Sequence, residues 1–379
     1  MTKVKAIQIV EDLKIGGAER VIESIALGLD RNIYSVEVWC LTAGGKVANR
    51  LIQRGITVKV LRLDSYYNPV NIIRLSMLLK RSRARLIHTH GYFASTFARL
   101  AAILVRPLII IIHVHTTHYG LGLRNRTIER LLSIFTDKVI CISKSVRDFV
   151  IREERINAAK TALVYNGIAV PDGFVDDFHS KSLLKKIGLE SNHKIIITVA
   201  SLQPHKGHKV LIEAFNEVLK KNPKARLLII GEGPLKEYLS GYVDNKGLSR
   251  FIVFLGEQEN VYQFLSIAHL FVLSSVEREG LGLALIEAMA MKLPVVGSNL
   301  GGIKELIEDG INGRLFRSGD SLELANAIHE ILNDNETSRR LGSAGRKRFE
   351  KKFQEKQMIE SIGLLYHNLL LDADASRTI

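Results

Sequence analysis

The sequence contains few of the residues that mark exported or cross-linked proteins. Only two of its 379 residues are cysteines, and both Cys40 and Cys141 lie inside apolar runs. There is no Cys-x-x-Cys pair and no ladder of regularly spaced cysteines, so we expect two free, buried thiols and a reducing compartment. Prolines are also scarce, with seven in the chain, which argues against long disordered linkers.

Long apolar runs are lacking as well. The most apolar region, LAAILVRPLIIIIHVH, is interrupted by Arg106 and Pro107, whereas a helix that spans a bilayer needs about 20 apolar residues. The amino-terminal segment MTKVKAIQIVEDLKIGG enters a strand-like run directly and carries no export signal. We therefore expect a cytoplasmic protein.

Acidic residues are few in the first half of the chain. Residues 1–170 contain 26 Lys and Arg against 12 Asp and Glu, whereas residues 171–379 contain 27 of each. Between residues 71 and 130 there are ten basic residues and a single acid, Glu129. A basic half beside a neutral half predicts an anionic partner for the first half: a membrane surface, a nucleic acid or a phosphorylated substrate.

The segment NIIRLSMLLKRSRARL, residues 71–86, has apolar residues at helical spacing together with five basic residues. It predicts either a helix that lies on anionic lipid or an ordinary surface helix with a solvated basic face. The charge of the whole first half favours the membrane, at its inner face. Nucleic acid is not expected, because the basic residues are not interleaved with the aromatic residues that stack on bases.

Strand-like apolar runs alternate with helix-like periodic segments along the whole chain. Continuous β-branched runs with helices between them predict buried parallel strands in an α/β protein. A break near residues 164–182, which contains Gly167, Pro171 and Gly173, divides the chain into two such domains. The runs are VKAIQIV, SVEVWCL, TVKVLRL, RLIHTH, LIIIIHVH and KVICIS in the first half, and KIIITVAS, ARLLIIG, FIVFLG, LFVLSS and PVVGSN in the second.

Two glutamates stand out in VEREGLGLALIEAMAMKLPVVGSNLGG, residues 276–302. On one helix, Glu279 and Glu287 would lie about 12 Å apart along the axis, which is too far for the roughly 5–10 Å of a glycosidase-type pair. We therefore place Glu279 in a loop after the strand LFVLSS. Glu287 then lies about one turn inside a helix that begins near Leu283.

Between the two glutamates, Gly280 and Gly282 would let the backbone approach a ligand closely, and the helix start offers unpaired N–H groups to an anion. A carboxylate on each side of an anion-binding segment suits a nucleotide-diphosphate sugar, because this ligand has hydroxyls at both ends and phosphates in the middle. The alternative is a carboxylate in the first turn of a helix plus a solvated one.

Five histidines lie at two strand ends. His88 and His90 occur in LIHTHG, and His113, His115 and His118 occur in HVHTTHYG. Histidines at i and i+2 share one face of a strand, so a metal site is one alternative. We expect instead that His88 and His113 are buried core residues with satisfied hydrogen bonds.

Five segments, in order, resemble the GT-B retaining glycosyltransferases of family four. The resemblance covers nearly the whole chain and implies a GT-B fold, with two Rossmann-like parallel-sheet domains facing each other across a deep cleft. The domains would be residues 1–170, which bind the acceptor, and 171–357, which bind the donor, with the helix 358–379 packing back on the first. The segments are GGAER (16–20), ITVASLQPHKGHKVLIEAF, LLIIGEGP, FLGEQENVYQFLSIAHLFVLSS, and Glu279 through Glu287 to KLPVVGSNLGGIKELIEDGINGRLF.

The resemblance implies roles for residues of the donor site. Glu287 would hold the ribose hydroxyls, Glu279 a hydroxyl of the transferred sugar, and Lys206 the diphosphate, whose charge grows as it leaves. Such stabilisation is worth several kcal/mol. The other donor-site residues that we expect are Gly280, Leu281, Gly282, Leu283, Ser201, Gly16 and Gly17.

One position departs from the family. Ser201 in VASLQPHKG stands where the family often has an arginine that clamps the diphosphate, and it brings one hydrogen-bond donor but no charge. Either Lys206 and the helix end suffice, or Arg20 or another basic group compensates. In the first domain, His115 resembles the active-site histidine that contacts the transferred sugar, and His90 and Gly91 would line the same wall.

The implied function is transfer of a sugar from a nucleotide-diphosphate sugar, with a UDP-sugar favoured, to an acceptor hydroxyl with retention of configuration. The departing phosphate would take the acceptor's proton, and no cofactor or metal is expected. We expect the acceptor to be a lipid-linked saccharide in surface polysaccharide biosynthesis. The alternatives are a sugar-nucleotide epimerase of the same fold and a non-catalytic protein that binds a nucleotide sugar.

Overall fold

The computed structural model describes residues 3–14, 16–63, 65, 68–105, 108–117, 122–170 and 177–375. Arg106, Pro107, His118, Pro171 and Gly173, which entered the expectations above, lie outside these residues. The chain forms two units: Met1–Gly167 with Glu355–Ile379, and Ile168–Gln354.

The chain passes between the units a few residues before the positions expected from the sequence, 170 and 357. The Gly167 N–H donates a hydrogen bond to Met358 Sδ at 3.3 Å, within the first unit. The next N–H, of Ile168, donates to the Phe353 carbonyl at 3.0 Å, within the second unit. The N–H group of Gly167 is therefore held by the first unit and that of Ile168 by the second, so the chain leaves the first unit between these two residues.

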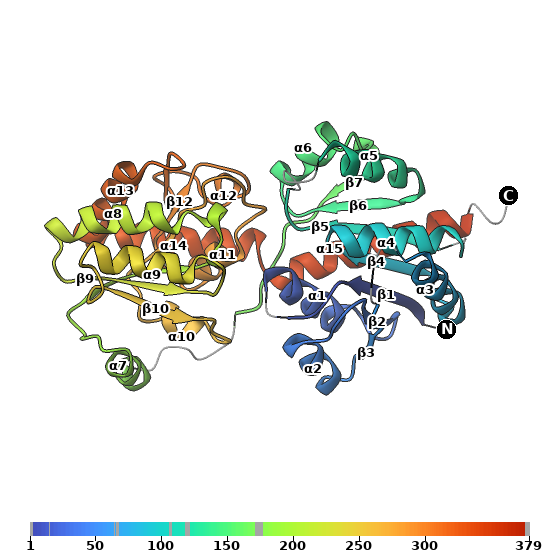
Figure 1. Ribbon diagram of the computed structural model, residues 1–379, viewed down its shortest axis with the longest axis horizontal. Coiled ribbons are helices and arrows are strands. Elements are labelled where there is room, and N and C mark those ends of the chain that lie inside the picture. Colours follow the sequence, from blue (N-terminus) through green and yellow to red (C-terminus); the bar gives the residue numbers. More distant parts are fainter. Residues whose placement is uncertain are drawn as a thin grey trace. The chain divides into compact units, whose positions relative to one another are not determined.

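The first unit contains, within the described residues, a parallel sheet of seven strands in the order β3-β2-β1-β4-β5-β6-β7 (Figure 1). The strands are β1 (Val4–Val10), β2 (Tyr34–Cys40), β3 (Thr57–Val60), β4 (Leu86–His90), β5 (Ile109–Val114), β6 (Lys138–Cys141) and β7 (Thr161–Leu163). The helices are α1 (Gly17–Gly28), α2 (Lys46–Gln53), α3 (Pro69–Ser82), α4 (Tyr92–Ile103), α5 (Leu123–Leu132), η1 (Ser133–Phe135), α6 (Lys144–Arg152), η2 (Ala158–Lys160) and α15 (Glu355–Ala375).

The second unit contains a parallel sheet of six strands, again within the described residues, in the order β10-β9-β8-β11-β12-β13. The strands are β8 (Lys194–Val199), β9 (Ala225–Ile230), β10 (Ile252–Gly256), β11 (Leu270–Leu273), β12 (Val295–Ser298) and β13 (Arg314–Phe316). The helices are α7 (Asp177–Lys186), η3 (Pro204–Lys206), α8 (His208–Lys221), α9 (Lys236–Asn245), α10 (Tyr262–Leu265), α11 (Leu283–Ala290), α12 (Ile303–Leu306), α13 (Ser321–Asn333) and α14 (Asn335–Lys352).

Successive residues of β1 point to opposite faces of the first sheet. Ile7 and Ile9 belong to the core under α3 and α4, whereas Val10 belongs to the core under α1 and α2. Gln8 faces the α1 side, because its Nε2 donates to the Ile22 carbonyl in α1 at 3.4 Å. This second face therefore carries a buried polar group in the middle of a strand.

The last helix, α15, lies beside α1 in the first unit (Figure 1). A β-carbon added at Gly28 of α1 would lie 2.1 Å from Cδ1 of Ile359, so the two helices approach closely at a glycine. Tyr366 of α15 is fully buried against the sheet face that Gln8 shares, where its hydroxyl contacts His88. The helix thus closes the polar face of the first sheet.

The two-domain α/β fold expected from the sequence is confirmed, and each apolar run named above overlaps a strand. Both cysteines are free and buried, as expected. The segment 71–86 is helical only to Ser82, because Arg83 takes a left-handed φ of 55° and β4 begins at Leu86. No helix among the described residues combines the length and the apolar character needed to cross a bilayer.

Candidate active site

In the second unit the residues singled out from the sequence follow the two strands at which the strand order reverses, and in the first unit they lie at those two strands and at the next strand, β5. The reversal lies between β8 and β11 in the second sheet and between β1 and β4 in the first. Open α/β sheets bind ligands beyond the carboxyl ends of their strands at this point. The topology therefore indicates a candidate site in each unit.

In the second unit, Lys206 and Glu279 form an ion pair across 73 residues of sequence. Lys206 Nζ lies 2.6 Å from Glu279 Oε2, and their side chains are 18% and 10% exposed. Ser275 Oγ donates to the same carboxylate oxygen at 2.8 Å. Because two donors hold this oxygen, the carboxylate of Glu279 is fixed in orientation. Both residues were expected in the donor site, but their contact with each other was not.

The loop that carries Glu279 packs against two glycines after β12. The Gly302 N–H donates to the Glu279 carbonyl at 3.0 Å. An added β-carbon would lie 2.3 Å from the Glu279 carbonyl oxygen at Gly301 and 2.2 Å from the Gly280 carbonyl oxygen at Gly302. Only glycine fits at either position, so this close packing holds the loop in place.

The helix after this loop, α11, begins at Leu283, as expected. Gly282 precedes it with a left-handed φ of 94°, and Leu281 is buried. Glu287 lies about one turn inside α11 and is 3% exposed, so the alternative of a solvated carboxylate is wrong for this residue. The N–H groups of Leu285 and Ile286 donate to the Gly282 carbonyl at 3.0 and 3.3 Å, so the backbone that can face an anion is the segment that precedes them, residues 280–283.

Ser201, the residue that replaces an arginine, follows β8 and is exposed. Its carbonyl accepts the Gln203 N–H at 2.8 Å in the turn that leads to Lys206. Arg20, the proposed compensating cation, lies in the first turn of α1 in the first unit. Within the second unit, Lys206 is therefore the basic side chain that the structure pairs with Glu279.

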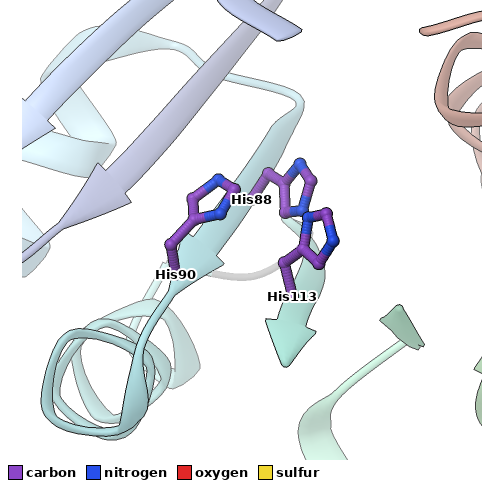
Figure 2. Close-up of side chains that lie close together, drawn as sticks. All are labelled: His88, His90 and His113. Atoms are coloured by element: carbon purple, nitrogen blue, oxygen red, sulfur yellow. The ribbon is translucent and has the colours of Figure 1, made fainter. Parts of the chain in front are cut away.

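In the first unit, four histidines gather at the carboxyl ends of β4 and β5. Figure 2 shows the rings of His88 and His90 on β4 beside that of His113 on β5. The ring centroids of His88 and His113 are 5.2 Å apart and their planes differ by 8°. His115, just after β5, stacks on His113 with a centroid distance of 4.3 Å and a 22° inclination. His88, His113 and His115 therefore form a stack of imidazoles.

His88, His90 and His113 each offer one ring nitrogen that could bind a metal ion, and these three nitrogens lie within 4.8 Å of one another. A metal such as zinc needs ring nitrogens that converge on one point at about 2.0–2.1 Å. The rings of His88 and His113 are nearly parallel, whereas the ring of His90 is inclined by 32° to His88 and by 37° to His113. The three side chains are therefore close together without forming one parallel stack.

Burial keeps these histidines neutral. It lowers the pKa of His88 to about 3 and the pKa of His90 and His113 well below the usual value of 6.5, and the neighbouring histidines add to the effect. A neutral imidazole has one donor and one acceptor nitrogen, so the cluster can form hydrogen bonds without burying charge.

The expectation that His88 and His113 have satisfied hydrogen bonds is wrong in part. His88 Nδ1 lies 2.7 Å from the Tyr366 hydroxyl, but its Nε2 has no partner among the described residues. Both ring nitrogens of His113 lack partners there as well. Such buried, unpaired groups cost about 1–3 kcal/mol each, so ring packing rather than hydrogen bonding accommodates His113.

His90 is held between Gln8 and His115. Its Nε2 lies 3.1 Å from Gln8 Oε1, and its Nδ1 lies 3.0 Å from His115 Nε2. Because the Gln8 amide nitrogen already donates to Ile22, its oxygen accepts from His90 Nε2–H. His90 Nδ1 is then the acceptor for His115 Nε2–H, so this chain of contacts sets the tautomer of His115. A lone glutamine inside the apolar run VKAIQIV was the overlooked signal for this contact.

Three glycines lie at the starts of two helices, α1 and α4, at the same edge of the first sheet. Gly16 is the N-cap of α1, Gly17 is its first residue, and the Arg20 N–H donates to the Gly16 carbonyl at 3.2 Å. Gly91 precedes α4 with a left-handed φ of 80° and is exposed, and an added β-carbon there would meet no atom within 4 Å. These residues surround the carboxyl ends of the neighbouring strands β1 and β4.

Comparison with known proteins identifies related families for both units. A model of "Glycosyl transferases group 1" matches residues 180–348, and a model of "Glycosyltransferase Family 4" matches residues 15–170. EpsD of Bacillus subtilis (strain 168), which carries a glycosyltransferase name, is 27% identical over 340 residues that cover 86% of this chain and 88% of EpsD.

A second relative is the UDP-Gal:alpha-D-GlcNAc-diphosphoundecaprenol alpha-1,3-galactosyltransferase of Escherichia coli. It is 27% identical over 274 residues, which cover 70% of each chain. Among solved structures, Anabaena HepE in complex with UDP and glucose superposes with a TM-score of 0.86 at 22% identity, over 96% of this chain and all of HepE. This structural likeness supports the GT-B fold. The chain belongs to the group 1 glycosyltransferases and is a GT-B glycosyltransferase.

Proposed function

We propose that this glycosyltransferase uses a UDP-sugar as donor and transfers the sugar, with retention of configuration, to a lipid-linked saccharide in surface polysaccharide biosynthesis. The observation that carries the donor assignment is the contact of Lys206, Glu279 and Ser275 beside the glycine-bounded start of α11. It combines a fixed carboxylate, a cation and a helix start at the point where the strand order reverses.

Each group has a distinct task in this proposal. The Lys206 ammonium neutralises the diphosphate, and Glu279 accepts a hydrogen bond from a hydroxyl of the sugar. Because an ammonium has three donors, Lys206 can keep Glu279 oriented while it contacts a phosphate oxygen. Glu287 accepts hydrogen bonds from the ribose hydroxyls, and backbone N–H groups in the segment 280–283 lie near the phosphates.

The reaction forms one bond and breaks one at the anomeric carbon. The acceptor oxygen bonds to that carbon on the face from which the diphosphate oxygen departs, and the departing phosphate takes the hydroxyl proton. Stabilisation of the charge on the leaving diphosphate lowers the barrier by several kcal/mol. The proposal assigns no metal and no further cofactor to this step.

We assign the acceptor to the first unit. His115 contacts a hydroxyl of the transferred sugar, and its Nε2 is held by His90. The other first-unit residues in the proposal are Gly91 and Arg20 on the acceptor side and Gly16 and Gly17 on the donor side. His90, expected on the acceptor side, is 2% exposed with both ring nitrogens engaged, so in the proposal it positions His115.

The choice of donor and acceptor is supported by related proteins. HepE, which shares the fold, was solved with UDP and glucose. The Escherichia coli relative is named for a UDP-galactose donor and a diphosphoundecaprenol-linked acceptor. Both support uridine as the base, and the Escherichia coli relative supports a lipid-linked saccharide as the acceptor.

The first test is a thermal-shift panel with UDP, GDP and ADP on the wild type and on Glu287→Ala. A ligand at 100 times its dissociation constant adds about 2.7 kcal/mol to the free energy of unfolding. We expect UDP to raise the melting temperature of the wild type and to lose this effect in Glu287→Ala. Glu277→Ala, which changes an exposed glutamate near the same loop, should keep the response.

A second measurement distinguishes the possible reactions. With a UDP-sugar and a lipid-linked saccharide, mass spectrometry should detect the lengthened saccharide together with UDP. Release of UDP with an altered free sugar in the absence of acceptor would identify an epimerase. Binding of UDP without any turnover of a panel of UDP-sugars would identify a binding protein. Either result would overturn the transfer proposal.

A further inference from the structure

Exposed apolar side chains gather on one set of helices in the first unit. Among the described residues, nine of the seventeen large hydrophobic side chains that are exposed lie on or directly beside α3, α4, α5 and η1. Six of the nine are about half exposed or more, and such a concentration marks an interaction surface. They are Val70, Ile73, Met77, Phe93, Leu100, Leu104, Leu131, Ile134 and Phe135.

These helices are neighbours. In the first unit α4 contacts both α3 and α5, and η1 continues α5 (Figure 1). The inner sides of α3 and α4 fill one core against β1, β4 and β5, so their exposed residues point away from the sheet. We call this surface, formed by α3, α4, α5 and η1 with Leu104, the helical face.

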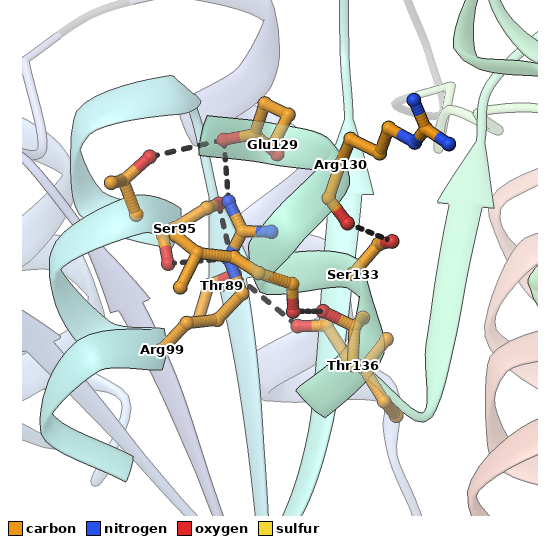
Figure 3. Close-up of polar contacts among 10 residues, drawn as sticks. Thr89, Ser95, Arg99, Glu129, Arg130, Ser133 and Thr136 are labelled. Atoms are coloured by element: carbon orange, nitrogen blue, oxygen red, sulfur yellow. Dashed lines mark hydrogen bonds and ion pairs between the residues drawn. The ribbon is translucent and has the colours of Figure 1, made fainter. Parts of the chain in front are cut away.

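The exposed charged side chains of the helical face are all basic, because its one acidic residue is buried. Glu129 is the one acidic residue in these helices; it is 5% exposed and lies 2.5 Å from Arg99 Nη2, which is fully buried. Figure 3 shows Glu129 and Arg99 turned toward each other, whereas the guanidinium of Arg130 points away from them. The exposed charged residues of these helices are Arg74, Lys80, Arg81, Arg124 and Arg130.

We propose that the helical face docks on the surface of an anionic lipid bilayer. Apolar side chains such as Ile73 and Ile134 enter the boundary between headgroups and acyl chains, while the arginines and Lys80 contact lipid phosphates. The absence of an exposed acid on these helices removes the repulsion that an anionic surface would otherwise meet. This inference deepens the proposed function, because a lipid-linked acceptor is presented at such a surface.

The charge pattern and side-chain composition favour a bilayer over other occupants. A protein partner would be expected to meet a mixture of charges at the polar rim of an interface, whereas this face presents one sign. Proteins that bind single-stranded nucleic acid stack its bases on several aromatic side chains, whereas the described part of this face exposes only two phenylalanines among its aliphatic side chains. Scattered aliphatic and basic groups suit a fluid, anionic, partly apolar surface.

The test is flotation of the full chain with vesicles of phosphatidylcholine, with and without phosphatidylglycerol, at low and high salt. We expect binding to the anionic vesicles that weakens as salt is added, and little binding to the neutral ones. The double variant Ile73→Asp with Met77→Asp should reduce the bound fraction about tenfold, and Ile134→Asp should reduce it less.

The matched control is Ile311→Asp with Leu322→Asp, which places two acids at exposed apolar positions of the second unit. This control should float like the wild type. Failure of the wild type to bind anionic vesicles, equal loss in the control, or retention on RNA instead of vesicles would overturn the docking surface. The UDP thermal shift, measured on each variant, tests the donor site separately, and the fluorescence of Trp39 in the first unit reports whether that unit is folded.

Discussion

The two units of this glycosyltransferase have comparable topologies but different chemistry at corresponding places. Each sheet is parallel and reverses its order once, and in each the candidate residues lie at or beside the strands at the reversal. The first unit gathers stacked neutral histidines there, whereas the second gathers the ion pair of Lys206 and Glu279. The fold thus determines where a site forms, and the side chains determine its charge.

Burial accounts for this difference. His88, His90 and His113 are at most 2% exposed, and an imidazole can stay neutral at such a position by giving up its proton. Lys206 and Glu279 keep some contact with solvent and neutralise each other. The second site can therefore offer a cation to a diphosphate, and the first can offer hydrogen bonds to a neutral saccharide.

Lowering the pH should disrupt the first unit most strongly. The three buried histidines have pKa values below 6.5 in the folded protein, so the unfolded chain binds more protons as the pH falls below that value. Their stabilising effect is complete above about pH 6.5 and is lost as the pH drops toward 3. If all three stay neutral when folded, the free energy of unfolding should fall by about 4 kcal/mol per pH unit below pH 6.5.

Urea unfolding followed by the fluorescence of Trp39, which lies in the first unit, measures this slope at a series of pH values. His113→Phe keeps an aromatic ring and removes one titrating group. Its slope should be smaller by about 1.4 kcal/mol per pH unit. Equal slopes for the variant and the wild type would show that His113 is not a buried neutral group.

Removal of the cation should disrupt the second site without unfolding it. Lys206→Ala should lower kcat by about 100- to 1000-fold, the loss typical when one group that stabilises developing charge is removed. The melting temperature should also fall, because the Glu279 side chain, 10% exposed, loses its counter-ion. The release of UDP from a UDP-sugar in the presence of acceptor measures the rate. Lys209→Ala, at an exposed lysine on the next helix, serves as the control. A rate near that of the wild type in Lys206→Ala would remove this residue from the proposal.

Replacement of Gln8 tests how the first site is held. In Gln8→Leu the His90 Nε2–H loses its acceptor, and one unsatisfied buried donor costs about 1–3 kcal/mol. Because His90 can then take the other tautomer, the nitrogen-15 spectrum of the histidine side chains should change for His115 as well. Gln53→Leu, at an exposed glutamine, should alter neither the stability nor the spectrum beyond about 0.5 kcal/mol. An unchanged His115 tautomer in Gln8→Leu would contradict the chain of contacts.

The strands missed by sequence analysis show why part of the fold was hard to predict. Each named apolar run overlaps a strand, but β7 and β13 have three residues each and lie at the edges of their sheets. An edge strand has one neighbour, and a three-residue segment is too short for an apolar periodicity to be recognised. Pattern alone therefore identified the strands of four or more residues, including the edge strands β3 and β10, and missed these two.

The candidate site was predictable residue by residue but not as an arrangement. The loop position of Glu279 and the start of α11 at Leu283 followed from the glycines and the apolar spacing. The contact between Lys206 and Glu279 spans 73 residues, and the role of Ser275 in orienting the carboxylate had no signal beyond its place after a strand. Such contacts depend on how neighbouring strands bring their following loops together.

By itself, the sequence determined the local structure and the distribution of charge. Apolar β-branched runs specify buried parallel strands, glycines specify where helices can begin, and the excess of basic residues lies in the first half of the chain. These properties depend on near neighbours or on composition, so no three-dimensional information is needed to recognise them.

Only the tertiary structure decided which groups meet and which are buried. It placed Tyr366 against His88 across 278 residues and His90 against Gln8 across 82. It also buried Glu129, the one acidic residue of α3, α4, α5 and η1. The charged side chains that these helices expose are therefore all basic. The physical reason is that strand order and helix packing set distances between residues far apart in the chain, and burial then sets their charge.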